Sequence, residues 1–149
     1  MSRDPVEPDA ELTLRAEAAD ARVASAWLVE AGAERGVPPD QVFRLDHCLD
    51  EVLANITAHG GATAAGAPVL LRLQVRRDAQ GAEAEVTVSD AGRAFDPITA
   101  EVKPRPATLA EAEPGGLGLV LIRRFADRLS YSCRDGRNHF AFAVRWGSP

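Results

Sequence analysis

The chain has 149 residues, a length that suits one domain able to bury a core without disulfides or structural metals. Hydrophobic residues make up 46% of it and charged residues 26%, a balance that excludes an intrinsically disordered chain. The net charge of −5, with arginines scattered along the sequence, argues against nucleic acid as a direct partner.

The N-terminal segment shows no sign of export. Residues 1–10 are acidic, contain two prolines and lack the apolar stretch of a signal peptide. No run reaches the ~20 apolar residues of a membrane span. Cys48 and Cys133 lie far apart, so two free thiols are favoured over a disulfide. We expect a cytoplasmic protein without a membrane segment, with a flexible leader over residues 1–10 and one domain over residues 11–149.

The domain is predicted to open with a strand and a helix. Residues 11–16 alternate polar and apolar side chains, which is the period of a half-buried strand. Residues 20–35 change to a helical period, and Gly36 ends it. The apolar side chains at four-residue steps in this helix are Val23, Trp27 and Ala31.

A second helix is predicted from the prolines at 38 and 39 to about His59, where two glycines end it. Six apolar side chains at helical spacing are expected to face a sheet: Val42, Leu45, Leu49, Val52, Leu53 and Ile56. Four polar side chains at four-residue steps form a line roughly opposite this stripe: His47, Glu51, Asn55 and His59.

The polar line differs from an ordinary solvated face, which would be rich in Lys and Glu. Its predicted neighbours are small, namely Cys48, Ala54 and Ala58, and the solvent edge is assigned to Asp46, Asp50 and Thr57. Small neighbours leave room for a ligand, and a carboxylate one turn from an amide oxygen suits Mg²⁺. The alternative is helix capping by Asn55 and His59 beside an exposed Glu51.

The second half is predicted to contain two hairpins, a long loop and a third helix. The predicted strands cover residues 68–77, 83–89, 129–133 and 138–146. Residues 91–115 hold four prolines without a sustained period, which is typical of a functional loop. The third helix starts at the glycines that follow and reaches about Asp127. The sum is an α+β fold, a two-layer α/β sandwich whose mostly antiparallel sheet is covered on one face by helices.

Two glycine-containing segments are candidates for ligand binding in this predicted fold. Asp90 ends an alternating strand, where its carboxylate can accept a hydrogen bond from an exocyclic amine, and Gly92 lets the backbone approach a flat base. Residues 114–119 open a helix, where N–H groups and the helix dipole favour an anion. The segment is neither a Walker P-loop nor a Rossmann fingerprint. The alternative for Asp90 and Gly92 is an ordinary turn after a strand, and the alternative for residues 114–119 is a flexible loop that ends at a helix.

Taken in order, the three segments resemble the GHKL (Bergerat-fold) ATPases. The matching positions are Glu51-x-x-x-Asn55 for the N-box, Asp90-x-Gly92 for the first glycine box and Gly116-x-Gly118-Leu119 for the second. The stretches DEVLANITAHG and GGLGLVLIRRFAD are similar to the anti-sigma factor serine/threonine-protein kinases of that family. The resemblance covers residues 12–146. Ala94 and Gly61 depart from the family pattern, and neither departure removes a charged group.

The resemblance implies a role for each matching position. Asn55 would ligate a Mg²⁺ ion that bridges the phosphates of ATP. Glu51 would be the general base for a serine or threonine hydroxyl of a protein partner. Asp90 would bind the adenine amino group, with Gly92 beside the base. The phosphates would be held by Gly115, Gly116, Leu117, Gly118 and Leu119, and residues 96–115 would form a lid.

The resemblance therefore predicts an ATP-dependent serine/threonine-protein kinase that acts as an anti-sigma factor. Its partners would be a sigma factor and an anti-anti-sigma protein of the STAS type, which it would phosphorylate. The subgroup often forms homodimers. Three alternatives stay open: an ATP-sensing module that switches partners without phosphoryl transfer, a detached histidine-kinase catalytic domain, and a structural protein without a ligand.

Overall fold

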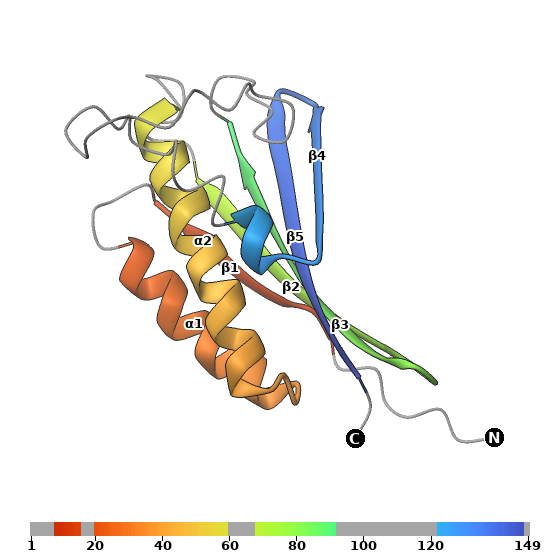
Figure 1. Cartoon of the computed structure of the whole chain (residues 1–149). Coiled ribbons are helices and arrows are strands. Elements are labelled where there is room, and N and C mark those ends of the chain that lie inside the picture. Colours follow the sequence, from red (N-terminus) through yellow and green to blue (C-terminus); the bar gives the residue numbers. More distant parts are fainter. Residues whose placement is uncertain (1–7, 16–19, 60–67, 92–121, 148–149) are drawn as a thin grey trace, which may run out of the picture.

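The computed structural model describes residues 8–15, 20–59, 68–91 and 122–147 (Figure 1). Its elements, in chain order, are β1 (Ala10–Leu14), α1 (Asp20–Glu34), α2 (Pro39–His59), β2 (Val69–Asp78), β3 (Gly81–Asp90), β4 (Arg128–Arg134) and β5 (Arg137–Gly147). A short helix, residues 122–125, precedes β4 and ends two residues before the predicted Asp127. The predicted strands and the first two helices are confirmed, with ends shifted by one or two residues.

The five strands form one antiparallel sheet in the order β1-β2-β3-β5-β4. Helices α1 and α2 and the short helix all lie on one face of this sheet (Figure 1). This arrangement confirms the predicted α+β sandwich. In the part of the chain that the structure describes, no helix has the length and apolar character of a membrane span.

Both hairpins turn where the sequence indicates. At the β2–β3 turn the Asp78 carboxylate accepts hydrogen bonds from the backbone N–H groups of Gln80 and Gly81, at 2.7 and 3.0 Å. At the β4–β5 turn Asp135 and Gly136 both have positive φ, 55° and 73°, which is the backbone of a type I′ hairpin. These local signals set the register of each hairpin.

The core lies between α2 and the middle of the sheet. Of the predicted stripe on α2, five side chains are buried and Ile56 packs partly buried against them. Burial of Leu45 and Leu49, both at 1% exposure or less, contributes about 2 kcal/mol each. On helix α1 the buried side chains are Ala24, Leu28 and Ala31, whereas Val23 is 48% exposed.

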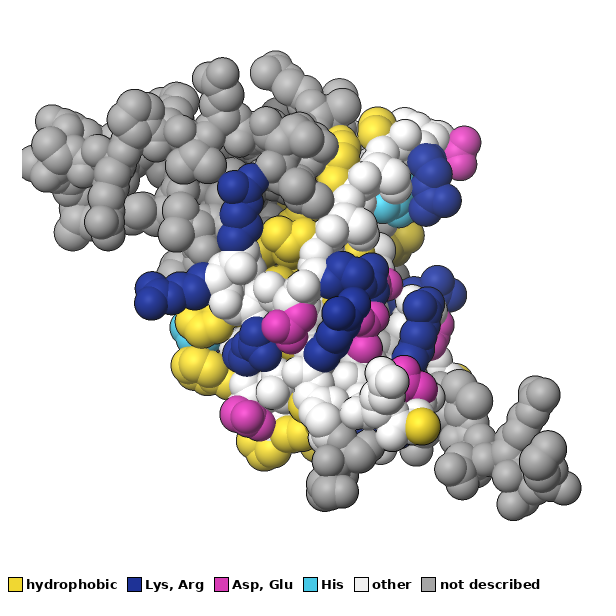
Figure 2. Space-filling model, turned by 45° about the vertical axis from the view of Figure 1, so that its right-hand side comes forward, with side chains coloured by type: hydrophobic (Ala, Val, Ile, Leu, Met, Phe, Trp, Pro, Cys, Tyr) yellow, Lys and Arg dark blue, Asp and Glu magenta, His cyan; other side chains and the backbone are white. Residues whose placement is uncertain are grey.

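Arginine and acidic side chains lie side by side on the face of the molecule shown in Figure 2. Arg128 of β4 forms ion pairs with Glu83, at 2.6 Å, and with Glu85, although β5 separates β4 from β3. Ala143 is the β5 residue paired in register with both Glu85 and Arg128, and it is fully buried. The hydrogen bond from Arg128 also lowers the pKa of Glu83. These pairs tie the edge strand to the centre of the sheet.

Candidate functional site

The candidate site lies where the C-terminal half of α2 meets the end of β3 and the start of β5 (Figure 1). Glu51 and Asn55 lie one turn apart on α2, and both side chains are half-buried. Asp90 is the last residue of β3 and is paired in register with Asn138 of β5. The structure thus brings the N-box positions and the adenine-binding candidate to the same end of the molecule.

Asp90 is held by a chain of hydrogen bonds that crosses the sheet. The Tyr131 hydroxyl donates to the Asn138 amide oxygen at 2.5 Å, and the Asn138 amide nitrogen donates to Asp90 Oδ1 at 3.2 Å. Asp90 and Asn138 are only 7% and 6% exposed. A carboxylate can accept about four hydrogen bonds, so Asp90 can accept one from Asn138 and one from an exocyclic amine together.

Arg137 fixes the backbone next to Asp90. Its guanidinium donates to Ser89 Oγ at 2.9 Å and to the Ser89 carbonyl oxygen at 3.0 Å. It also donates to the Pro68 carbonyl oxygen at 2.9 Å. One side chain of β5 therefore connects the start of β2 with the end of β3.

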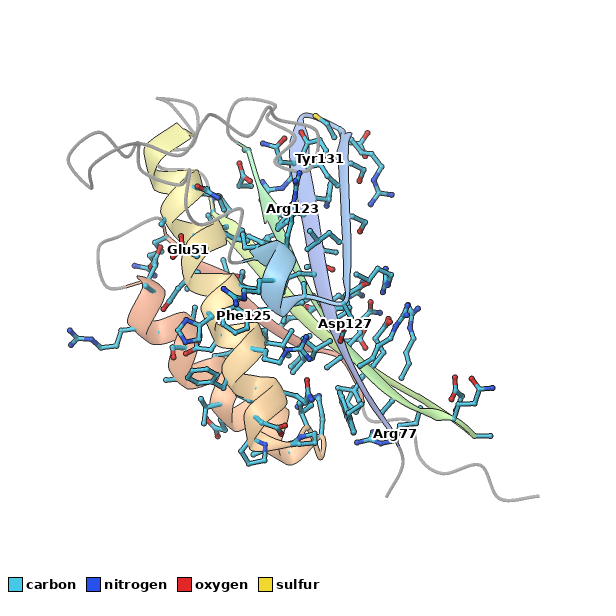
Figure 3. The ribbon with its side chains drawn as sticks, viewed as in Figure 1. Glu51, Arg77, Arg123, Phe125, Asp127 and Tyr131 are labelled. Carbon is cyan, nitrogen blue, oxygen red and sulfur yellow. The ribbon has the colours of Figure 1, made fainter. Side chains whose placement is uncertain are left out.

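The short helix is anchored on α2 by packing (Figure 3). The Cys48 thiol lies 4.0 Å from the Ile122 carbonyl oxygen, and the His47 ring stacks on Phe125 at a centroid distance of 5.4 Å. Asp127, just after the helix, accepts from the Arg145 backbone N–H at 2.6 Å and pairs with an α2 arginine at 3.4 Å. Residues 122–127, which follow the second glycine box in the sequence, are thereby fixed against both α2 and the sheet.

This packing corrects two predictions for α2. Cys48 does not border a ligand space, because the short helix covers it and leaves it 1% exposed. Asp46 is half-buried, where a solvent-edge position was predicted, and its Oδ1 has no hydrogen-bond partner within the described residues. The sequence pattern missed both because the short helix and α1 pack beside α2 and widen its buried face.

The two thiols should differ sharply in reactivity. Both are free, Cys48 buried and Cys133 exposed, which confirms the predicted absence of a disulfide between them. Burial raises the pKa of Cys48 to about 12, so its thiol stays protonated near neutral pH. We expect a thiol-specific reagent to modify Cys133 in the native protein and Cys48 only after unfolding. Fast modification of Cys48 in the native protein would contradict this packing.

Asn138 and Tyr131 belong to the candidate site through their hydrogen bonds, and the sequence reasoning did not name them. They reach Asp90 through pairing between β3 and β5, which no local pattern predicts. A weak signal existed, because Asn138 shares its strand face with Phe140, Phe142 and Val144. A polar side chain on an otherwise apolar strand face indicates a specific hydrogen-bond partner.

Several predicted site positions lie outside the described residues. They are Gly92, Gly115, Gly116, Leu117, Gly118, Leu119 and the lid over residues 96–115. The side chain of His59 and the departures at Gly61 and Ala94 lie outside them as well. Their roles stay predictions that depend on the family resemblance.

Comparisons with known proteins address that resemblance. A family model described as the histidine kinase-like ATPase domain matches residues 14–143. The serine/threonine-protein kinase BtrW of Bordetella bronchiseptica is 41% identical over 97 residues. That alignment covers 65% of this chain and 66% of BtrW, slightly less than two thirds of its length.

Two solved structures share the fold. The RsbU and RsbW domains of Rv1364c from Mycobacterium tuberculosis match with a TM-score of 0.67 and 19% identity, over 96% of this chain and 34% of that one. The SiaB–SiaC complex from Pseudomonas aeruginosa matches with a TM-score of 0.60 and 16% identity. The match covers 92% of this chain and 88% of the matched chain. The chain therefore belongs to the histidine kinase-like ATPase family, and its resemblance to a serine/threonine-protein kinase of the GHKL type is confirmed.

Proposed function

We propose that the chain is an ATP-dependent serine/threonine-protein kinase that acts as an anti-sigma factor in a partner-switching pathway. It binds a sigma factor and phosphorylates an anti-anti-sigma protein of the STAS type. The observation that carries the proposal is that the C-terminal half of α2, which carries Glu51 and Asn55, lies at the same end of the fold as the end of β3, which carries Asp90. The 41% identity to a serine/threonine-protein kinase supports the reaction class.

Asp90 and Asn55 bind the nucleotide in this proposal, and Glu51 takes part in the reaction. Asp90, oriented by Asn138, accepts a hydrogen bond from the adenine amino group. The amide oxygen of Asn55 is the kind of hard donor that Mg²⁺ takes, and its half-buried side chain can reach a bound ion. When bound, Mg²⁺ neutralises charge on the phosphates. Asn55 therefore belongs to nucleotide binding.

Glu51 acts on the protein substrate. Its carboxylate takes the proton of a serine or threonine hydroxyl as that oxygen attacks the γ-phosphorus. The new P–O bond forms while the bond to the oxygen bridging the β- and γ-phosphates breaks, and ADP leaves. Glu51 lies one turn before Asn55 on the same helix, so the base is close to the residue that holds the metal.

Nucleotide binding is the first test. Mg²⁺-ATP at about 100 times its dissociation constant should stabilise the protein by about 3 kcal/mol, which raises Tm by several degrees. Asn55→Ala should remove most of the Mg²⁺-dependent part of this shift and leave the Tm of the free protein nearly unchanged. A wild-type protein whose Tm responds to neither ATP nor ADP would rule out a working nucleotide site.

Transfer of label is the second test. The protein, Mg²⁺ and γ-labelled ATP are incubated with candidate STAS-domain proteins, each beside a variant whose acceptor serine or threonine is alanine. Label on the wild-type substrate alone supports the kinase. ATP binding without label on any candidate would favour the alternative, an ATP-sensing module that switches partners without phosphoryl transfer.

A further inference from the structure

Three aromatic rings form a row between α2 and the short helix, and the first of them is open to solvent. Phe43 is 58% exposed, more than any other large hydrophobic side chain in the described residues. Its ring meets the His47 ring edge to face, with the ring centroids 4.4 Å apart. The His47 ring in turn stacks on Phe125, with 16° between the two ring planes. We call Phe43, His47 and Phe125 the aromatic row.

The aromatic row is held in place although two of its members are exposed. The exposed His47 ring contacts Phe43 on one side and the half-buried Phe125 on the other. Just beyond Phe125, the ion pair between Arg44 and Asp127 ties the end of the short helix to α2 at 3.4 Å. Ordered aromatic side chains lose little conformational freedom on binding, and such residues supply much of the binding energy of protein interfaces. The row therefore suits an anchor for a partner protein.

The aromatic row lies close to Glu51, the proposed general base. Glu51 follows His47 by one turn of α2 and Phe43 by two turns, which is about 6 and about 12 Å along the helix axis. At about 100° per residue, Glu51 lies about 40° around the axis from His47 and about 80° from Phe43. Figure 3 shows Glu51 farther along α2 than Phe125. The row and the proposed base thus share one side of α2.

The surface of α2 beside Glu51 leaves room for a partner protein. Ala54 is exposed and lies within about 20° of His47 around the helix axis. Its small side chain lets the backbone of a partner approach the helix closely. Asp50, the neighbour of Glu51 in the chain, is exposed as well. A protein that reaches Glu51 can therefore lie along α2 toward the aromatic row.

The size of an ordinary interface requires a protein substrate at Glu51 to cover the row. A standard interface buries about 800 Å² on each partner, which corresponds to a patch of about 16 Å radius. Phe43 lies about 14 Å from Glu51 when the turn around the helix axis is included. The nucleotide is assigned to Asn55 and Asp90, so the substrate protein has to extend from Glu51 in the other direction, toward Phe43. A sigma factor is not required to reach Glu51, and the position of the row therefore selects the phosphoacceptor.

We propose that the aromatic row is the docking surface for the phosphoacceptor protein. The row receives an apolar side chain of that protein while the acceptor hydroxyl lies at Glu51. The exposed ring of Phe43 supplies most of the contact, and the stacked rings of His47 and Phe125 support it. The proposal rests on the proposed function, because only a phosphoacceptor has to reach Glu51. It assigns specificity for the substrate to side chains about 14 Å from the reacting atoms.

Steady-state kinetics test the docking surface. The full chain, Mg²⁺ and γ-labelled ATP are combined with a STAS-domain protein that receives label. Phe43→Ala should raise the KM for that protein at least about tenfold and leave kcat within about twofold, because the docked side chain is far from the reacting atoms. Phe43→Leu keeps an apolar side chain and should recover most of the wild-type KM. An unchanged KM in Phe43→Ala would overturn the proposal.

A matched control separates docking from a general loss of exposed apolar surface. Leu70→Ala removes a side chain of β2 that is 41% exposed, and it should leave both KM and kcat unchanged. The Tm of free Phe43→Ala and its dissociation constant for ATP should equal those of the wild type, because Phe43 is exposed and lies far from the residues assigned to the nucleotide. A KM that rises equally in Leu70→Ala would contradict a specific role of the row.

Direct binding distinguishes failure of the docking surface from failure of the kinase. Calorimetry with Mg²⁺-ADP present measures the Kd of STAS-domain proteins without phosphoryl transfer, and Phe43→Ala should raise this Kd as it raises KM. Binding that depends on Phe43 but never leads to label transfer would overturn the kinase and support the docking surface. Label transfer that is insensitive to Phe43 would overturn the docking surface alone. A panel in which no STAS-domain protein binds the wild type would overturn both.

Discussion

Replacing Glu51 with alanine should slow phosphoryl transfer by about 10²- to 10⁴-fold while ATP still binds. A general base acts on the proton of the attacking hydroxyl, and that interaction is gained mainly in the transition state. The groups assigned to the nucleotide, Asn55 and Asp90, stay in place because Glu51 makes no hydrogen bond to them. The measurement is the initial rate of label transfer to a STAS-type substrate, with the ATP dissociation constant determined in parallel.

Two controls separate catalysis from general damage. Glu51→Gln keeps the shape of the side chain but cannot take a proton, so it should be as slow as the alanine variant. Glu11→Gln neutralises an exposed carboxylate of β1 and should leave the rate unchanged. Transfer at the wild-type rate in both Glu51 variants would refute the assigned base. Loss of ATP binding along with transfer would assign Glu51 to the nucleotide or its metal.

Local chemistry made most of the fold predictable. Each hairpin turn carries its own signal, and the strands around it alternate cleanly. Strand order was not predictable, because β5 inserts between β3 and β4 through contacts between distant parts of the chain. The same limit explains Cys48, which is covered by a helix more than 70 residues later. Periodicity shows which face of an element is apolar, and it does not show what else packs beside that face.

The residues of the candidate site likewise fall into two groups, those that lie in short sequence motifs and those that join the site through strand pairing. Short motifs predicted the positions of Glu51 and Asn55 on a helix and of Asp90 at a strand end, and these positions are confirmed, while the roles of the three residues stay proposals. Asn138 and Tyr131 could not be predicted, because they join the site through strand pairing.

Replacing Asp90 with asparagine should weaken ATP binding by about 10- to 100-fold, which is the cost of losing a hydrogen bond to a charged group. The change is nearly isosteric. The asparagine oxygen can still accept from Asn138 Nδ2, so the Tyr131–Asn138 chain stays intact. Its amide nitrogen then points a donor at the adenine amino group, which is also a donor. Equilibrium binding of ATP to both proteins measures the loss.

Inosine triphosphate provides the matched comparison, because its base carries a carbonyl oxygen where adenine carries the amino group. The wild-type carboxylate accepts from adenine and repels that oxygen, so the wild type should prefer ATP. In Asp90→Asn the new amide donor can form a hydrogen bond with the carbonyl oxygen of inosine triphosphate. The preference for ATP over inosine triphosphate should therefore decrease or reverse. An equal loss of binding affinity for ATP and inosine triphosphate would mean that Asp90 supports the fold of the site without contacting the base.

Asn138→Ala then shows how Asp90 is oriented. Without the amide donor the Asp90 carboxylate stays chemically able to accept from adenine but loses one of the hydrogen bonds that orient it, so the preference for ATP over inosine triphosphate should shrink without reversing. Because the two residues act through one hydrogen bond, the effects of Asp90→Asn and Asn138→Ala on ATP affinity should fall short of additive in the double variant. Full additivity would show that Asn138 acts independently of Asp90, and the base contact would then rest on the carboxylate alone.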